Sequence, residues 1–153
     1  MTYTDFDLVF TSFLDIERLV FDFEAGILPK DRWTHHAHLI VGTWYIARHE
    51  DSIAIDRIRR GIRRHNAAVG TLDTPTSGYH ETITLAWAKL IRQYLIVNNI
   101  VDIRSLSLYR GVVAEFCDPG YLFRFYEKAL LMSPAARATW VEPDKLALPS
   151  IDD

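Results

Sequence analysis

The chain lacks several features that would assign it quickly to a compartment or a class of protein. Its 153 residues contain one cysteine, Cys117, so no disulfide can form within the chain. No apolar run approaches the roughly 20 residues of a membrane-spanning helix, and the first seven residues have neither the basic nor the apolar stretch of a secretory signal. We therefore expect a cytoplasmic protein without a membrane segment.

The motifs of several large enzyme classes are also missing. The sequence has no glycine-rich phosphate loop, no nucleophile elbow, no Cys-x-x-Cys pair and no His-Glu-x-x-His. Its net charge of −3 gives no general reason to expect binding to nucleic acid. We expect neither a nucleotide cofactor nor a nucleic-acid partner, while the oligomeric state stays open.

What the chain does contain is apolar residues at helical spacing. Hydrophobic residues make up 49% of the sequence, and no alternating pattern competes with the helical ones. The pattern, with its capping and stop signals, predicts five main helices over about 7–25, 34–49, 51–70, 79–97 and 103–116. Short helices are expected after Asp118-Pro119-Gly120 and at Ser133-Pro134, followed by an irregular tail over 141–153. The prediction is an all-α helical bundle forming a single domain over 1–153.

Histidines supply the strongest indication of chemistry. The segment Trp33–Leu39 holds three of the six histidines, at the start of the second predicted helix. Because each helical residue advances by about 100°, His35 and His38 lie about 60° apart, whereas His36 points away from both and shares its side with Thr43. The sequence therefore predicts that His35 and His38 act as a pair.

A third inward histidine, His80, opens the fourth predicted helix. The helical count places it on the apolar stripe, with Glu81 at the border of an outer face that includes Thr82. The helix between the two histidine segments returns the chain to the same end of the bundle, so the three imidazoles could meet there.

Three such nitrogens would suit Zn²⁺, Fe or Ni and leave a position for water. Glu81 would then be a further ligand or a general base, and Tyr79 would orient a small-molecule substrate, as in a metal-dependent hydrolase or transferase. Two other interpretations stay open. The histidines could line a metal-free polar or acid–base pocket, or could be structural core groups bonded to backbone carbonyls.

Five arginines crowd the third predicted helix, between Arg57 and Arg64. A solvated outer face is the common explanation of such a pattern, but the face could also contact an anionic partner. The alternative function is therefore a non-enzymatic binding or interaction module, with structural histidines in its core and this arginine-rich helix as its partner surface.

The segments Trp33-Thr34-His35-x-Ala37-His38-Leu39 and Gly78-Tyr79-His80-Glu81-Thr82-Ile83-Thr84 resemble those of a family of small bacterial proteins with no established activity. The resemblance implies that His35, His38, His80 and Glu81 belong together, and it implies no reaction. The design is also distantly similar to the three-histidine metal sites of DinB-like helical bundles, although this chain has no His-x-x-x-His on one helix.

Overall fold

The computed structural model describes residues 3–150, so the last three residues of the predicted tail lie outside the described part. The all-α prediction is confirmed, because helices account for all the regular structure of this range apart from one isolated bridge between Thr74 and Ser77. The α-helices are α1 (Tyr3–Val9), α2 (Phe13–Glu24), α3 (His35–Arg48), α4 (Asp51–Ala68), α5 (Glu81–Val97), α6 (Leu106–Phe116), α7 (Lys128–Leu131) and α8 (Pro134–Ala138). Two short 3₁₀ turns span Lys30–Arg32 and Tyr121–Arg124. None of the described helices is long and apolar enough to cross a membrane.

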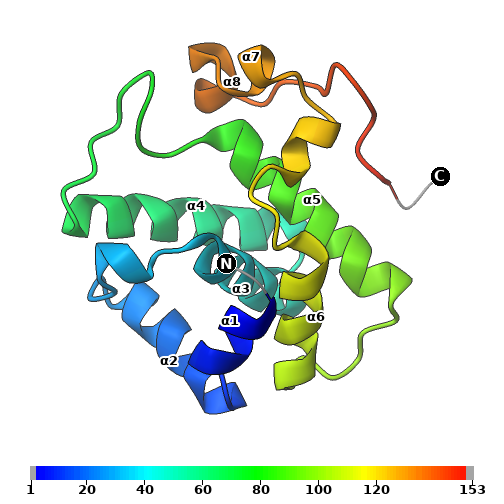
Figure 1. Ribbon diagram of the computed structural model, residues 1–153. Coiled ribbons are helices and arrows are strands. Elements are labelled where there is room, and N and C mark those ends of the chain that lie inside the picture. Colours follow the sequence, from blue (N-terminus) through cyan, green and yellow to red (C-terminus); the bar gives the residue numbers. More distant parts are fainter. Residues whose placement is uncertain (1–2, 151–153) are drawn as a thin grey trace.

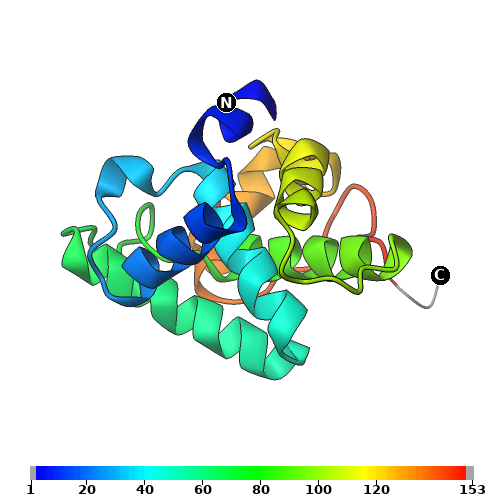
Figure 2. The ribbon, with the colours of Figure 1, turned by 90° about the horizontal axis from the view of Figure 1, so that it is seen from below.

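Helix α3 occupies the centre of the bundle, with α2, α4, α5 and α6 packed around it (Figures 1 and 2). This position follows from its composition, because a helix that is apolar nearly all round must be covered on several sides. Leu39, Ile40, Val41 and Ile46 are each 1% exposed. The first turn of α3, which carries the histidines, is thereby fixed between its neighbours.

Gly42 allows α3 and α5 to approach closely. An added Cβ atom at Gly42 would lie 3.1 Å from Cδ1 of Ile91 on α5, which is tighter than ordinary van der Waals contact. A methyl group at this position would require the Ile91 side chain to shift by a few tenths of an ångström. The close packing of α3 on α5 places the starts of these helices beside one small pocket, which is described below.

The first predicted helix is wrong in one respect, because the structure divides it into α1 and α2. The break falls at Thr11 and Ser12, whose backbone N–H groups both donate to the Asp15 carboxylate. Such local hydrogen bonds satisfy backbone donors that a new helix start leaves without partners. The Ser12-x-x-Asp15 pattern was therefore the signal for a second helix start.

The C-terminal segment corrects a second expectation, the outward orientation of Thr82. Helix α8 packs against α5, and residues 139–141 run alongside the start of α5. The Thr82 hydroxyl donates to the Thr139 carbonyl at 2.9 Å and accepts from the Val141 N–H at 3.1 Å, so Thr82 is fully buried. The helical count could not reveal that a later segment covers this face.

Candidate functional site

A small pocket lies between α3, α4 and α5, and we call it the α3–α5 pocket. Its volume is about 60 Å³. The walls are mostly aliphatic and aromatic, and no residue that lines it in the described chain carries a carboxylate, an ammonium or a guanidinium group. The lining residues are Trp33, His35, His38, Leu39, Val41, Gly42, Ile46, Ile58, Ile62, Ile83, Thr84, Trp87, Ala88 and Ile91.

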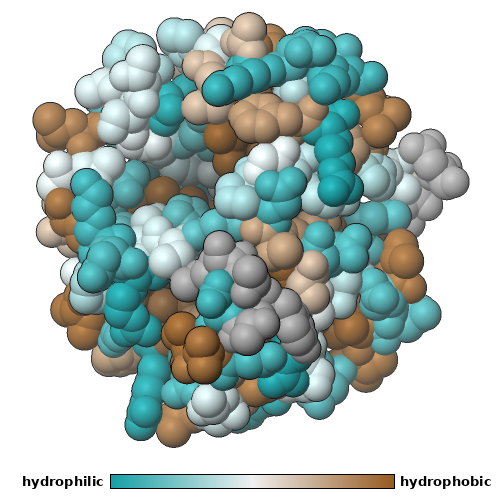
Figure 3. All heavy atoms as spheres, in the orientation of Figure 1, coloured by the Kyte–Doolittle hydropathy of each residue, from teal (hydrophilic) through white to brown (hydrophobic). Residues whose placement is uncertain are grey.

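The pocket opens at the N-terminal ends of α3 and α5. His38 is exposed and His35, Thr84 and Trp87 are half-buried, whereas the residues of the inner wall, such as Ile91, are buried. On the face drawn in Figure 3, the surface is hollowed between α4 and the segment that leads into α5. Solvent therefore reaches His38 and, in part, His35.

His35, the first residue of α3, contacts the end of α6. Its Nε2 atom lies 2.7 Å from the carbonyl oxygen of Phe116, the last residue of α6. A carbonyl can only accept, so Nε2 carries the proton and Nδ1 is unprotonated in the neutral ring. Burial lowers the pKa of His35, against the opposing effect of the Phe116 hydrogen bond.

His38 is bonded within its own helix. Its Nδ1 atom lies 2.6 Å from the carbonyl oxygen of Thr34, the N-cap residue of α3. The same argument puts the proton on Nδ1 and leaves Nε2 as an acceptor. Solvent reaches the ring, yet it lies in a recess where desolvation lowers its pKa, and the Thr34 bond only partly offsets this. We therefore expect a neutral His38 at pH 7.

Each pocket histidine packs against a tryptophan. The ring centroids of His38 and Trp33 are 3.7 Å apart, and those of His35 and Trp87 are 5.2 Å apart. These contacts restrict the imidazoles, and the tryptophans add flat apolar surface to the pocket. His35 and His38, which the helical count places on one face, both line this pocket.

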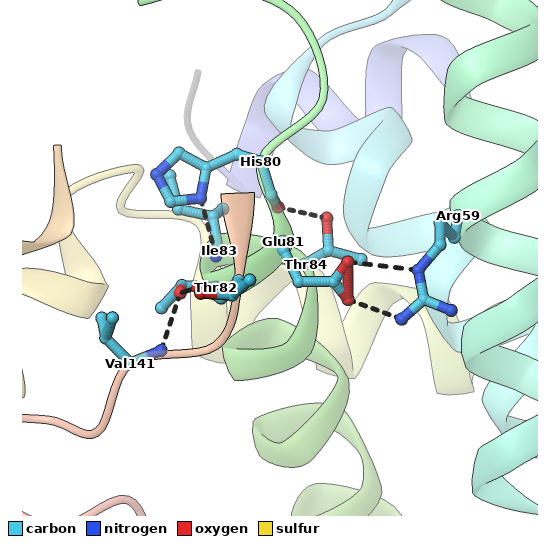
Figure 4. Close-up of polar contacts among 8 residues, drawn as sticks. Arg59, His80, Glu81, Thr82, Ile83, Thr84 and Val141 are labelled. Carbon is cyan, nitrogen blue, oxygen red and sulfur yellow. Dashed lines mark hydrogen bonds and ion pairs between the residues drawn. The ribbon is translucent and has the colours of Figure 1, made fainter. Parts of the chain in front are cut away.

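His80 does not join them, because it is not among the residues that line the pocket. It is the N-cap of α5, and its Nδ1 atom accepts from the Ile83 N–H at 3.1 Å. Its Nε2 atom lies 2.8 Å from the carbonyl oxygen of Leu131, to which it donates. Both ring nitrogens are therefore engaged, and the His80 ring lies on the opposite side of the α5 start from Arg59 (Figure 4).

Glu81 is held in an ion pair across to α4. Arg59 donates to it twice, through Nη2 to Oε1 at 2.5 Å and through Nε to Oε2 at 3.2 Å. The hydrogen bond with Glu81 raises the pKa of Arg59. This pair fixes the start of α5 against α4, and its carboxylate does not line the pocket (Figure 4).

Tyr79 lies just before α5 and is 6% exposed. The guanidinium of Arg63 stands 4.6 Å from its ring centroid, and burial raises the pKa of its hydroxyl. Tyr79 does not line the pocket either. The catalytic roles expected of Glu81 and Tyr79 stay predictions.

The described residues contain no group of three or more histidine, cysteine, aspartate or glutamate side chains arranged to hold a metal ion. Within the α3–α5 pocket the imidazole nitrogens that could act as ligands are His35 Nδ1 and His38 Nε2. Catalytic zinc sites have three protein ligands as a rule. A divalent metal in the pocket would need a ligand from beyond this lining, and its binding stays a prediction.

Two further histidines, His36 and His65, are buried. His36 is 1% exposed, lies beside the Phe6 ring and has no hydrogen-bond partner for either ring nitrogen within residues 3–150. His65 is also 1% exposed, and its Nε2 atom is hydrogen-bonded to the Leu28 carbonyl oxygen. The ring centroids of His65 and Trp33 are 5.1 Å apart. Neither lines the pocket. His36 is thus separate from the pair, as the helical count predicts.

The arginine-rich face of α4 is partly neutralised by its own neighbours. Arg59 pairs with Glu81, Arg60 with Asp56, and Arg63 stacks on Tyr79. Arg57, Arg60 and Arg64 line an open groove of about 680 Å³, together with Glu24 and Asp56. Because this groove carries charges of both signs, it does not favour a partner of either charge. The role of the face as a partner surface stays a prediction.

A second groove, of about 590 Å³, lies beside Trp140–Ser150 and contains none of the histidines.

Comparisons with family models, with curated proteins and with solved structures find nothing that matches this chain. The site must therefore be interpreted from its own geometry. The resemblance of the histidine segments to a bacterial family stays a prediction.

Proposed function

We propose that this chain binds a small uncharged molecule in the α3–α5 pocket, with His35 and His38 as its polar contacts. One observation supports this most strongly. Two imidazoles that the helical pattern pairs in the sequence line one apolar pocket, and each has a ring nitrogen without a protein partner in the described chain. A few polar groups that converge on an apolar pocket usually orient a small ligand, so acceptor nitrogens beside this pocket favour a ligand role.

The lining supports an uncharged ligand. An ion that enters an apolar pocket loses its hydration and needs an opposite charge to compensate, which costs several kcal/mol when none is present. The lining residues carry no such charge, and the lowered pKa values of His35 and His38 favour neutral rings. A carboxylate or an ammonium ion should bind less well than a neutral molecule of the same size.

The volume supports a small ligand. Pockets for drug-sized molecules enclose about 300 Å³ or more. A space of about 60 Å³ accommodates the small end of a molecule, and the rest of that molecule would lie outside it. A single ring with one polar substituent fits these limits.

The proposal includes no resident metal, because His80 has both nitrogens engaged and the pocket lining supplies two imidazoles. Metal analysis of protein purified without a histidine tag and incubated with Zn²⁺ is the direct check. Stoichiometric metal that is lost in His38→Ala would replace this proposal with the metal-dependent one.

The binding test uses phenol, benzoate and benzylamine as probes, followed by the NMR signals of the Trp33 and Trp87 indole N–H groups. We expect saturable shifts with phenol and at least tenfold weaker binding of the two charged probes. Ile62→Phe, which fills the pocket from α4, should weaken phenol binding at least tenfold. Ile53→Phe makes the same change at an exposed position of α4 outside the pocket and should leave binding unchanged.

Absence of saturable phenol shifts would contradict the proposal. Equal loss of binding in Ile62→Phe and Ile53→Phe would also contradict it, because the probe would then bind elsewhere.

A further inference from the structure

The polar side chains of the α3–α5 pocket share one property, which is the direction of their hydrogen bonds. His35 Nε2 lies 2.7 Å from the Phe116 carbonyl oxygen, and His38 Nδ1 lies 2.6 Å from that of Thr34. The hydroxyl of Thr84 donates to the His80 carbonyl at 2.8 Å (Figure 4). Each of these three groups directs its hydrogen to a backbone carbonyl.

This arrangement decides what the groups can offer to a ligand. A neutral imidazole has one N–H, so a ring that donates to a carbonyl has only an acceptor left on its other nitrogen. A hydroxyl that donates in the same way likewise keeps only its oxygen lone pairs. His35, His38 and Thr84 therefore present acceptors, and the only other polar groups of the lining are the indole N–H groups of Trp33 and Trp87.

The helix ends fix this pattern. Phe116 is the last residue of α6, where carbonyls have no partner within the helix, and Thr34 is the N-cap of α3. If the His35 ring turned to present its N–H to the pocket, the Phe116 carbonyl would lose its donor. If the His38 ring did so, the Thr34 carbonyl would lose its hydrogen bond from that ring. Loss of the only hydrogen bond of a carbonyl is unfavourable and opposes reversal of the His35 ring, whereas Thr34 O would keep its bond from the His38 N–H.

We propose that the α3–α5 pocket selects ligands that donate hydrogen bonds, such as phenols, alcohols and amide N–H groups, over ligands of the same size that only accept. The inference rests on the proposed binding function and specifies the chemical class of its ligand. The acceptors are His35 Nδ1, His38 Nε2 and Thr84 Oγ1. Aldehydes, ethers and aryl halides, which have no polar hydrogen, would leave these atoms unpaired.

Phenol and fluorobenzene form a matched pair of probes, because they have the same number of heavy atoms and only phenol donates. The quantity to measure is the ratio of their affinities for one protein, since this ratio cancels the general effect of a variant on the pocket. One lost hydrogen bond of about 1 kcal/mol changes an affinity roughly fivefold. We expect the phenol-to-fluorobenzene ratio to fall about fivefold in His35→Phe, in His38→Phe or in both.

His36→Phe is the matched control, because it makes the same substitution on the same helix outside the pocket. Its affinity ratio should equal that of the wild type. Thr84→Val serves as a second variant that keeps the shape of the side chain, so the test does not depend on the stability of the histidine variants. Each variant is accepted for the comparison if its amide NMR spectrum keeps the dispersion of the folded protein.

A ratio that stays at the wild-type value in His35→Phe, His38→Phe and Thr84→Val would overturn the donor preference while leaving the binding function in place. If neither phenol nor fluorobenzene binds to the wild type, the proposed function itself fails. A drop confined to the pocket variants supports both.

Discussion

The starts of α3 and α5 both carry histidine, yet the two regions use it differently. At the start of α5, His80 accepts from the Ile83 N–H and donates to the Leu131 carbonyl, so its ring is fully used by the protein. At the start of α3, His35 and His38 each donate to one carbonyl and keep one nitrogen unused beside a pocket. Among these three histidines, the ring with both nitrogens bonded to the protein has a structural role, and the rings with an unused nitrogen beside the pocket are the candidates for binding.

The largest expected effect tests this difference through stability. In His80→Ala, α5 loses its cap and the Leu131 carbonyl loses its donor, which should cost about 2–4 kcal/mol of unfolding free energy. His38→Ala should cost less than about 1 kcal/mol, because Thr34 O still accepts from the His38 N–H at 3.0 Å. Urea denaturation of both variants measures the difference.

His80→Asn provides the control for that comparison. Asparagine is a favourable N-cap residue, so it should restore part of the stability lost in His80→Ala. The comparison of the two helix starts would be wrong if His38→Ala cost as much as His80→Ala.

A smaller effect is expected from the ion pair that holds α5 to α4. Arg59→Met leaves the Glu81 carboxylate, which is 13% exposed, without its cation and should cost about 1–2 kcal/mol. A double-mutant cycle with Glu81→Gln isolates the coupling between the two side chains. Arg60→Glu, at an exposed pair on the same helix, should change stability by less than about 0.5 kcal/mol. If Glu81→Gln abolished phenol binding, Glu81 would belong to the site after all.

The smallest expected effect is on the pH dependence of the free energy of unfolding. Burial lowers the pKa values of His35, His36, His38 and His80 below the ordinary 6.5. Between the folded and unfolded pKa values the unfolded chain binds more protons, so the free energy of unfolding falls as the pH drops through 6.5. The free energy of unfolding levels off at pH values below the folded-state pKa values. We expect this dependence to weaken by about 1 kcal/mol or less in His38→Phe, and a stability that rises on acidification would contradict it.

Much of the fold followed from the sequence because helical periodicity and caps are local signals. The apolar pattern predicted a helix over about 34–49, where α3 lies, and Ser133-Pro134 predicted the start of α8. The burial of Thr82 could not be predicted, because it depends on contacts with residues 139–141, which are remote in sequence.

The placement of His35 and His38 on one face of α3 was predicted for the same reason. His35 and His38 lie one turn apart on one helix, so their pairing is a local property. The position of the His80 ring relative to this pair depends on the carbonyl to which each ring donates. These carbonyls belong to Phe116 for His35 and to Leu131 for His80, and both are distant in the chain. Sequence spacing carries no information about those partners.

The protonation of the His35 and His38 rings is the most direct test of the account. Ring ¹⁵N chemical shifts and ring proton correlations at pH 7 distinguish the two neutral tautomers and the charged form. We predict two neutral rings, with the proton of His35 on Nε2 and that of His38 on Nδ1, so that both unused nitrogens are acceptors. Charged rings, or protons on His35 Nδ1 and His38 Nε2, would contradict it.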